Sequence, residues 1–329
     1  MIWLQFSFSA AVVVFAAIKL AEYGDIIAVR TKLGGLFVGT IFLAGATSLP
    51  ELIASISAFQ AGFPNLAAGN FFGSNMVNMM LLAMVDLINY QVPLLRRVAI
   101  SHALTAALTM ILMLVAIISI LDEVDITIGW VGVDSLIIIG LYFGGIWLIQ
   151  RENRGSSKAA PVAEPASDFP TLRRGVIGFF ATAVVLILIV PTLVSASTDI
   201  AEITGLGTGF IGTALLSLVT SLPELIAALA AMRMNAYDMA IGNLFGSSVF
   251  NMLSLGIADF FYTDGRFLGA IDDNFVLVGL LGLLLTSMAL VGNLARVERK
   301  FLFVEIDTIA TIVVYLLGMY LLFIRGIGA

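Results

Sequence analysis

Long runs of apolar residues, separated by short polar stretches, fill almost the whole chain. Ten of these runs reach or exceed the roughly 20 residues that a helix needs to cross a bilayer. They lie near residues 3–22, 33–61, 66–89, 95–120, 126–150, 173–195, 206–233, 237–262, 267–293 and 302–324. The first run has no basic start and no small-residue cleavage site, so we interpret it as a membrane helix and not as a signal peptide. The pattern predicts an all-α integral membrane protein with ten transmembrane helices.

One polar run divides this pattern. Residues 151–172 are rich in charged residues, serine and proline, which predicts a flexible linker. Five predicted helices precede the linker and five follow it. An odd number of crossings inverts the second half relative to the first. We therefore expect a first five-helix repeat at 1–150, a cytoplasmic linker at 151–172 and a second five-helix repeat at 173–329.

Charged residues indicate the orientation and exclude several classes of function. With the N-terminus outside, the inside loops contain most of the basic residues, such as Arg30 and Arg233, and Arg266 is nearly alone outside. This bias predicts that both termini lie outside. A chain with 60% hydrophobic and 12% charged residues is not a soluble domain, and its net charge of −6 does not suggest nucleic-acid binding. It has no cysteine and one histidine, His102, so thiolate and histidine-built metal centres are not expected.

Two motifs occur twice, with a constant offset of 173 residues. Residues 39–52 read GTIFLAGATSLPEL and residues 212–225 read GTALLSLVTSLPEL; GNFFGSNMVNM at 69–79 is followed by GNLFGSSVFNM at 242–252. The first motif places Glu51, and in its second copy Glu224, beside a proline in an apolar segment. A charged residue at the centre of a membrane helix costs about 2.5–3.5 kcal/mol. Its appearance at matched positions of two inverted repeats favours an ion-binding site.

The residue types in these motifs favour a hard cation. Proline inside a helix removes a backbone hydrogen bond, so carbonyls near residues 46–47 are released. Thr47 and Glu51 are four residues apart and share a helix face, as do Ser74 and Asn78. Carboxylate, hydroxyl, amide and carbonyl oxygens suit Ca²⁺ and Na⁺. The candidate metal ligands are Glu51, Glu224, Thr47, Ser48, Thr220, Ser221, Ser74, Ser247, Asn78 and Asn251.

Each of these residues also has a purely structural interpretation. A lone buried glutamate can be a protonated packing residue, and the matched pair is what favours ion binding. Small residues also serve helix packing, and Asn70 and Asn243 fit interhelical hydrogen bonding as well as ion binding. Outside the motifs, snorkelling, interfacial or capping roles are expected for Lys19, His102, Asp86 and Asp259.

The two T-S-L-P-E-L runs and the two G-N-x-x-G-S-x-x-x-N runs resemble the cation/Ca²⁺ exchanger superfamily, in particular sodium/calcium exchangers of the prokaryotic type. The resemblance covers nearly the whole chain. It implies that broken second and seventh helices, with the third and eighth, surround the ion sites, and that the first and sixth helices slide over this core. It also implies a multi-pass protein of the plasma (inner) membrane. Its partners would be the lipid bilayer and inorganic cations, with no cofactor, nucleic acid or protein partner.

The resemblance also assigns roles to the candidate ligands. Glu51 and Glu224 would bind Ca²⁺ centrally, and Asn78 and Asn251 would flank it. The hydroxyls of the candidate set, on Thr47, Ser48, Thr220, Ser221, Ser74 and Ser247, would help to bind Na⁺. Carbonyls of Gly45 or Ala44, and of Ser217 or Leu218, would contribute. Many sodium/calcium exchangers and the potassium-dependent ones have aspartate where this chain has Asn251, so potassium dependence is not expected.

The expected function is a secondary antiporter that exchanges Ca²⁺ for Na⁺, and it is not an enzyme. Proton-coupled exchangers tend to show a Gly-Asn-Ala-x-Glu-His pattern that this chain lacks, but some bacterial relatives with TSLPE-like repeats are held to use protons. A proton-coupled antiporter of Ca²⁺ or another divalent cation therefore stays open. A passive cation channel is a further alternative, which a requirement for counterflow distinguishes. Intramembrane proteolysis needs a serine with a nearby base or two aspartates, and the motifs hold neither.

Overall fold

The structure is a computed structural model that describes residues 1–31, 43–88, 100–122, 126–156, 170–294, 300–301 and 304–328. The first half contains α1 (Ile2–Arg30), α3 (Leu49–Gln60), α4 (Pro64–Ile88), α5 (Ile100–Leu121) and α6 (Val133–Ser156), and residues 43–47 are also helical. The second half contains α7 (Leu172–Thr204), α8 (Thr208–Ile211), the π-helix η1 (Gly212–Leu216), α9 (Ser217–Thr220), α10 (Leu222–Arg233), α11 (Tyr237–Ala258), the 3₁₀-helix η2 (Asp259–Phe261), α12 (Phe267–Ala270), α13 (Phe275–Leu294) and α14 (Ile306–Arg325). Two antiparallel hairpins join strands β1 (Thr127–Ile128) to β2 (Val131–Gly132) and β3 (Lys300–Phe301) to β4 (Val304–Glu305).

The predicted class, an all-α integral membrane protein, is confirmed. Nine helical stretches among the described residues are long and apolar enough to cross a membrane, with α8 to α10 forming one of them. The predicted run 33–61 is described only from residue 43 onward, where it contains residues 43–47 and α3. The other nine predicted runs each correspond to one of these stretches.

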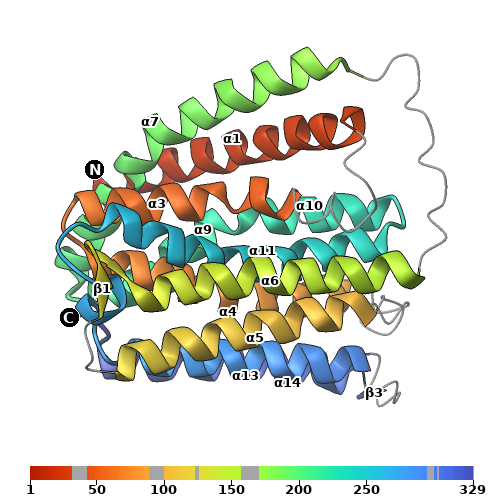
Figure 1. Cartoon of the computed structure of the whole chain (residues 1–329). Helices are drawn as coiled ribbons and strands as arrows, with labels where there is room; N and C mark the ends of the chain where they lie inside the picture. The colour runs from red at the N-terminus through yellow and green to blue at the C-terminus, as the bar shows by residue number, and fades with distance from the viewer. Residues whose placement is uncertain are drawn as a thin grey trace.

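Several predicted boundaries were wrong. The helix α1 continues to Arg30 and not to residue 22, and α7 continues to Thr204 and not to residue 195. These two helices pack against each other (Figure 1), and the last turn of α1 lies against the start of α7, where Arg30 Nε donates to the Pro170 carbonyl at 2.9 Å. The helix α6 extends through Ser156 into the predicted linker, of which residues 157–169 lie outside the described part. The run 267–293 is interrupted at Asp272, whose carbonyl accepts the amide of Phe275 at the start of α13.

The repeat extends well beyond the two sequence motifs. With the same offset of 173 residues, α3 and α10 begin at equivalent positions, and so do α4 and α11, and α6 and α14. The hairpins also match, because the pairing of Thr127 with Gly132 is equivalent to that of Lys300 with Glu305. Gly62 and Asn235, equivalent residues that follow α3 and α10, both have a positive φ, of 82° and 57°. Glycine and asparagine are the residues that tolerate this conformation best. The two halves therefore fold as copies of one five-helix unit.

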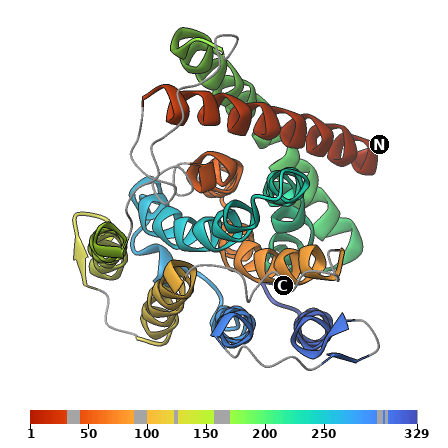
Figure 2. The same ribbon diagram turned by 90° about the vertical axis from the view of Figure 1, so that its right-hand side faces the viewer.

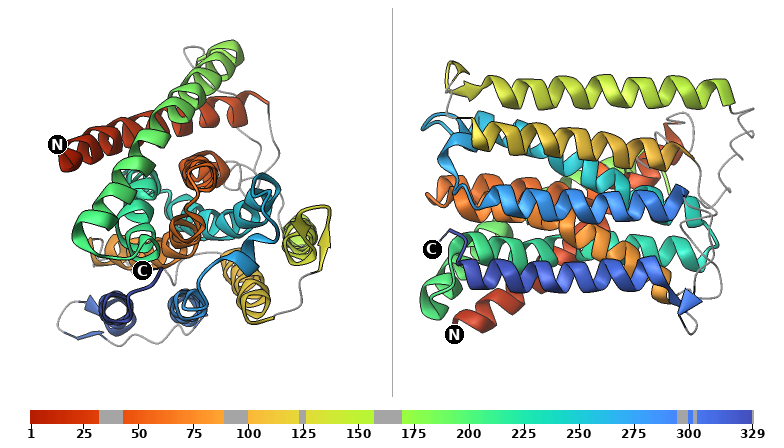
Figure 3. Two further views of the ribbon diagram at one scale, coloured as in Figure 1. Left: turned by 90° about the vertical axis from the view of Figure 1, so that its left-hand side faces the viewer. Right: turned by 90° about the horizontal axis from the view of Figure 1, so that it is seen from below.

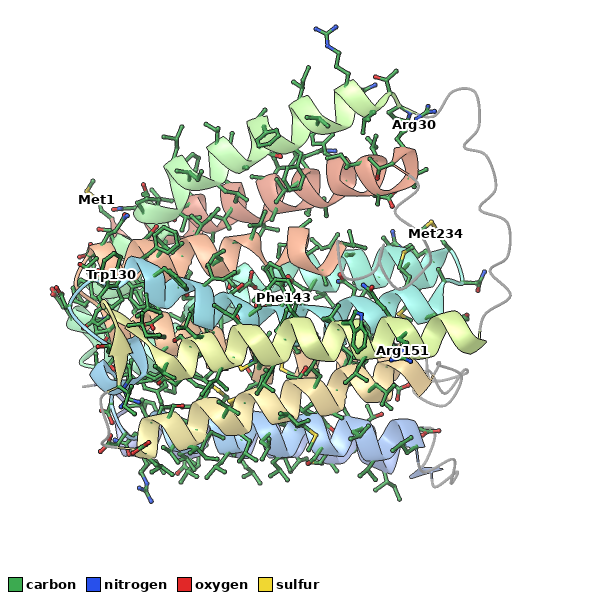
Figure 4. The ribbon with its side chains drawn as sticks, viewed as in Figure 1. Met1, Arg30, Trp130, Phe143, Arg151 and Met234 are labelled. Carbon is green, nitrogen blue, oxygen red and sulfur yellow. The ribbon has the colours of Figure 1, made fainter. Side chains whose placement is uncertain are left out.

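The two copies run in opposite directions. Figure 1 shows both chain termini at one end of the molecule, where α1 begins and α7 finishes. Met1 and Trp130 lie at this end, which we call the terminus end (Figure 4). Arg30, Arg151 and Met234 lie at the opposite end, which we call the linker end (Figure 4). Equivalent helices thus cross the molecule in opposite senses, as an inverted repeat requires.

Three groups of helices build the molecule. Figure 2 shows α3, α4, α10 and α11 at the centre, with the α1–α7 pair on one side. Figure 3 shows α5, α6, α13 and α14 together on the other side. In each of α4 and α11, 78% of the most apolar segment is buried, whereas in α7 the share is 17%. The helices α4 and α11 therefore belong to the core, and α7 is peripheral. Phe72 and its equivalent Phe245 are completely buried in this core.

The helix α4 lies unusually close to the second half of the chain. A Cβ atom on Gly69 would be 2.5 Å from the carbonyl oxygen of Gly209, and one on Gly73 would be 2.7 Å from that of Thr213. Because these are backbone atoms, only glycine fits at either position. The contact sets α4 directly against η1, the π-helix that leads into α9 and the second copy of the first motif.

Candidate ion-binding site

Each copy of the first motif contains a break in its helix. The break lies at Ser48 in the first half and at Ser221 in the second, with nearly the same dihedral angles of φ −90°, ψ 6° and φ −89°, ψ 0°. A proline follows two residues later, within the first turn of α3 or α10. Proline has no N–H group to donate, so the carbonyls of Ala46 and Val219 lack their usual helical partner. The expected release of carbonyls beside the motif therefore has a clear structural basis.

The two glutamates lie in the first turn of the helices that follow these breaks. Glu51 is the third residue of α3, Glu224 is the third residue of α10, and both side chains are completely buried. The N-terminus of a helix carries a partial positive charge, which favours a carboxylate at this position. The two carboxyl groups also lie close enough to interact electrostatically. Two buried carboxylates that repel each other need a proton or a cation to balance their charge.

Serines hold the glutamates in a reciprocal arrangement. The hydroxyl of Ser48 donates to Glu224 Oε1 at 2.9 Å, and the hydroxyl of Ser221 donates to Glu51 Oε1 at 3.1 Å. Each motif thus binds the carboxylate of the other. The second oxygen, Oε2, of each glutamate has no hydrogen-bond partner in the part of the chain that the structure describes. The arrangement leaves one oxygen of each carboxylate free at the centre of the fold.

The threonines of the motifs link these glutamates to α4 and α11. Thr47 Oγ1 lies 3.3 Å from Ser247 Oγ and donates to the carbonyl of Ala44. Thr220 Oγ1 lies 3.1 Å from Asn70 Oδ1, to which it can donate. Both threonines are completely buried.

The second motif supplies more buried oxygens from α4 and α11. Asn78 Nδ2 donates to Ser248 Oγ at 3.5 Å, and its Oδ1 has no partner among the described residues. The same holds for Ser74 Oγ and for both amide atoms of Asn251, within the described ranges. All four side chains are completely buried.

The structure therefore brings most of the predicted ligands into direct contact. Hydrogen bonds or close oxygen contacts connect Glu51 with Ser221, Glu224 with Ser48, and Thr47 with Ser247. Thr220 and Asn78 contact other buried polar residues, Asn70 and Ser248, that were not among the predicted ligands. Ser74 and Asn251 lie buried on the same two core helices without a hydrogen bond to the rest, as far as the described residues go.

Several buried polar residues around these ligands were not predicted from the sequence. Asn75 is completely buried, and its amide atoms have no partner within the described segments. Its equivalent in the second half is Ser248, the acceptor for Asn78. The signal was present in the sequence, because Asn75 and Asn78 are three residues apart and share a helix face. Ser55 was also missed, and it accepts a hydrogen bond from Asn70 at 3.1 Å.

The chemistry of this arrangement suits a hard cation. Among the described residues, no three histidine, cysteine, aspartate or glutamate side chains are grouped so that they could hold a metal ion. A cation beside Glu51 and Glu224 would meet two carboxylates and several neutral oxygens. Ca²⁺ accepts six to eight oxygen ligands in flexible geometry. The buried oxygens without a hydrogen-bond partner in the described part of the chain include Glu51 Oε2, Glu224 Oε2, Ser74 Oγ, Asn75 Oδ1, Asn78 Oδ1, Asn243 Oδ1 and Asn251 Oδ1.

The other ionisable residues singled out in the sequence have partners away from this centre. Lys19 forms an ion pair with Glu22 at 2.6 Å within α1. His102 Nε2 lies 3.6 Å from a carboxylate oxygen of Asp238, which is in the first turn of α11. Asp86 accepts a hydrogen bond from Thr308 at the start of α14. Its equivalent, Asp259, accepts the backbone amides of Gly132 and Phe267 at 2.7 and 2.8 Å, so both aspartates anchor helix ends.

Comparisons with known proteins agree with this architecture. The relative CaxA of Alkalimonas amylolytica is 26% identical over 299 residues, which is 87% of this chain and 89% of the relative. Among solved structures, the H⁺/Ca²⁺ exchanger CAX matches with a TM-score of 0.74 at 16% identity, covering 99% of this chain and 86% of its own. The sodium-calcium exchanger NCX_Mj matches with a TM-score of 0.59 at 17% identity, covering 96% of each chain. At these identities the two structures show a shared fold.

A family-level comparison covers both halves of the chain. The family described as sodium/calcium exchanger protein matches residues 1–149 and again residues 174–325. Together these two matches include both copies of each motif and nearly all of the described helices. The chain is therefore a member of the sodium/calcium exchanger protein family.

Proposed function

We propose that this protein is a secondary active antiporter that exchanges Ca²⁺ for Na⁺ by alternating access. The observation that carries the proposal is the reciprocal pair of buried glutamates, Glu51 and Glu224, each held by a serine of the opposite motif. Two carboxylates balance the charge of one Ca²⁺ or of two Na⁺. One site can therefore hold either ion in turn, and this mutual exclusion is what exchange requires.

The other predicted ligands fit supporting roles around this pair. Ca²⁺ would bind between the free Oε2 atoms of the glutamates, with the amide oxygens of Asn78 and Asn251 beside them. Na⁺ needs fewer charged ligands, and we assign it the buried hydroxyls of the two motifs. These are the hydroxyls of Thr47, Ser48, Thr220, Ser221, Ser74 and Ser247.

The helices α1 and α7 are the elements that we expect to move. They interlock closely, because a Cβ atom on Gly178 would be 2.4 Å from the ring of Tyr23 and one on Gly175 would be 2.8 Å from Ile26. Together they contact α3, α9 and α10, which carry the motif residues. A tightly joined pair on the periphery of the core can shift as one body and open the site to either end in turn.

The orientation in the membrane follows from the basic residues. The linker end of the described structure contains Arg30, Arg151, Arg173, Arg174 and Arg233, whereas Arg266 and Arg325 lie toward the terminus end. The positive-inside rule places the basic end in the cytoplasm. We therefore propose a plasma (inner) membrane protein with both termini outside, repeats at 1–150 and 173–329, and a cytoplasmic linker between them.

A proton-coupled antiporter of the same fold is the second candidate. The free Oε2 atom of each buried glutamate supports it, because that atom can hold a proton as readily as it can face a metal ion. In such a protein two protons would replace two sodium ions at the same carboxylates.

Gradient-driven flux in liposomes distinguishes these candidates. The purified protein is reconstituted in vesicles with one known orientation, and uptake of radioactive calcium is measured with opposing Na⁺, K⁺ or H⁺ gradients applied separately. The proposal expects uptake that depends on the Na⁺ gradient and ignores the K⁺ gradient. Uptake driven only by a pH gradient would replace it with the proton-coupled version. Calcium flux without any counter-ion would overturn antiport in favour of a channel.

A further inference from the structure

Two equivalent asparagines have different surroundings. Asn70 on α4 and Asn243 on α11 are related by the repeat offset and are 0% and 1% exposed. Asn70 Nδ2 donates to the Glu51 carbonyl at 2.9 Å and to Ser55 Oγ at 3.1 Å, and its Oδ1 lies 3.1 Å from Thr220 Oγ1. Both amide atoms of Asn243 lack a hydrogen-bond partner among the described residues. One asparagine is thus fully engaged and the other is available.

The difference has a cause in the sequence. The residue equivalent to Ser55 is Ala228, so the second half has no hydroxyl where Asn70 finds one. The residue equivalent to Thr220 is Thr47, whose hydroxyl donates to the Ala44 carbonyl and lies beside Ser247. Neither of the side-chain partners that occupy Asn70 is therefore supplied to Asn243. A buried amide without partners is costly, which favours a ligand that satisfies it.

The position of Asn243 points to the transported cation as that ligand. Asn243, Ser247 and Asn251 are four residues apart along α11 and lie on one helix face. Ser247 on this face contacts Thr47, and Asn251 has a free amide within the described structure. The free amide of Asn243 therefore lies on the face of α11 that carries the predicted ligands Ser247 and Asn251.

We propose that Asn243 is a further ligand for the transported cation, contributed through its amide oxygen, and that Asn70 only positions the first half of the site. This inference rests on the proposed antiport function and deepens it. It makes the two halves of the site unequal, because Asn243, Ser247 and Asn251 of α11 would all face the ion beside Glu224. It also assigns a role in ion selectivity to Ala228, which keeps the amide free.

The most direct test supplies the missing partner. Ala228→Ser gives Asn243 the hydroxyl that Asn70 already has, without removing any polar group. That hydroxyl would accept from Asn243 Nδ2, as Ser55 Oγ accepts from Asn70 Nδ2, and would fix the orientation of the amide group. If Asn243 Oδ1 binds the cation, holding the amide in this orientation should raise the apparent KM for Ca²⁺ about fivefold. Asn243→Ala should have a similar effect, and combining both changes should add little to either. The matched control is Ser57→Ala, also on α3, whose hydroxyl donates to the Ile53 carbonyl of its own helix; it is expected to leave the apparent KM within about twofold.

Thermal unfolding provides a readout that does not depend on transport. The Tm of the purified full-length protein is measured without and with Ca²⁺ for the wild type, Ala228→Ser and Asn243→Ala. The proposal expects a smaller Ca²⁺-dependent rise in Tm for both variants. A lower Tm without ion, together with an unchanged Ca²⁺-dependent rise and unchanged KM, would mean that Asn243 only packs, and would overturn the inference. A wild type that shows neither exchange nor a Ca²⁺-dependent rise would instead refute the antiport proposal itself.

Discussion

The two halves of the molecule are nearly identical at the glutamates and differ farther from them. At the centre, Ser48 binds Glu224 and Ser221 binds Glu51 with distances that differ by only 0.2 Å, from 2.9 to 3.1 Å. Farther along the helices, three completely buried serines each have an apolar equivalent in the other half. The pairs are Ser55 with Ala228, Ser217 with Ala44, and Ser254 with Leu81.

All three of these serines lie on the same side of the glutamates. From the direction in which their helices run, Ser55, Ser217 and Ser254 are displaced toward the terminus end, and their apolar equivalents toward the linker end (Figure 1). Symmetry is therefore retained around the two buried carboxylates, and it is lost toward the two ends of the molecule. The comparison separates residues that we expect to bind ions from residues that are free to diverge.

The largest effect should come from removing either carboxylate. Glu51→Gln and Glu224→Gln each keep the shape of the side chain but leave one charge to balance a divalent ion. We expect each change to lower Ca²⁺ exchange by at least about a hundredfold, because a buried ion pair cannot tolerate the loss of one partner. Calcium flux in liposomes measures this loss. If the two halves are equivalent, both variants should be affected to the same degree.

A matched control shows whether the loss of exchange is specific to the buried glutamates. Glu22→Gln changes a glutamate of α1 that is paired with Lys19 and is exposed on the helix surface. It should retain wild-type exchange, and all three variants should elute as folded protein in size-exclusion chromatography. Retained transport in both Glu51→Gln and Glu224→Gln would contradict the assignment of the site.

A second large effect is expected where α4 touches the second half of the chain. Gly69→Ala places a Cβ atom 2.5 Å from the Gly209 carbonyl and 2.8 Å from the Thr213 amide. These backbone atoms can move only if α4 and η1 separate, which should destabilise the protein by about 1–3 kcal/mol. A lower Tm checks the expectation. Gly140→Ala is the control, because nothing lies within 4 Å of a Cβ atom at that position in α6.

The same variant tests whether the repeat is structurally equivalent. Gly242 occupies the position of Gly69 in the second half, and the offset predicts a similar fall in Tm for Gly242→Ala. A fall in only one of the two would show that the halves pack differently at this contact.

Much of this fold could be predicted from the sequence, because its strongest sequence patterns follow from what a membrane protein physically requires. A bilayer requires long apolar helices, so the runs of apolar residues located the spans. A proline and a glutamate in such a run are costly enough to indicate a function, so Glu51 and Glu224 stood out. The constant offset then predicted which residues of the two halves would be equivalent.

Other features could not be predicted from the sequence, because they are very short segments or depend on contacts between helices. The hairpins at residues 127–132 and 300–305 are too short for their pattern to stand out from the adjoining helices. The full length of α1 depends on its packing against α7, which hydropathy does not report. The lack of partners for Asn243 among the described residues depends on Ala228 and Thr47, which lie on neighbouring helical segments. Such pairwise dependence becomes visible only when the helices are assembled.

A moderate effect is expected from the serines that hold the carboxylates. Ser48→Ala removes the hydroxyl that donates to Glu224, and Ser221→Ala removes the one that donates to Glu51. A hydrogen bond to a charged group is worth about 1.5–3 kcal/mol, so each change should raise the apparent KM for Ca²⁺ about tenfold or more. The structural similarity of the two contacts predicts effects that agree within about threefold. Initial rates of calcium uptake at varied Ca²⁺ measure both values, and a clear effect in only one half would contradict functional equivalence.

The smallest effect, and the most informative about the ion, is expected from adding a charge. Asn251 is completely buried on α11, and its amide has no partner in the described part of the chain. Asn251→Asp would bring a third acidic group to the site. When ionised, it should strengthen Ca²⁺ binding relative to Na⁺. When protonated, it should lose that advantage, so the variant's apparent KM for Ca²⁺ should rise more steeply than that of the wild type as pH falls.

Asn78→Asp, its equivalent on α4, should shift the pH profile in the same direction if the two amides flank one ion. A profile unchanged in both variants would place these residues outside the site, whereas a change in Asn251→Asp alone would show that the ion lies nearer to α11, the side on which we place the additional ligand Asn243.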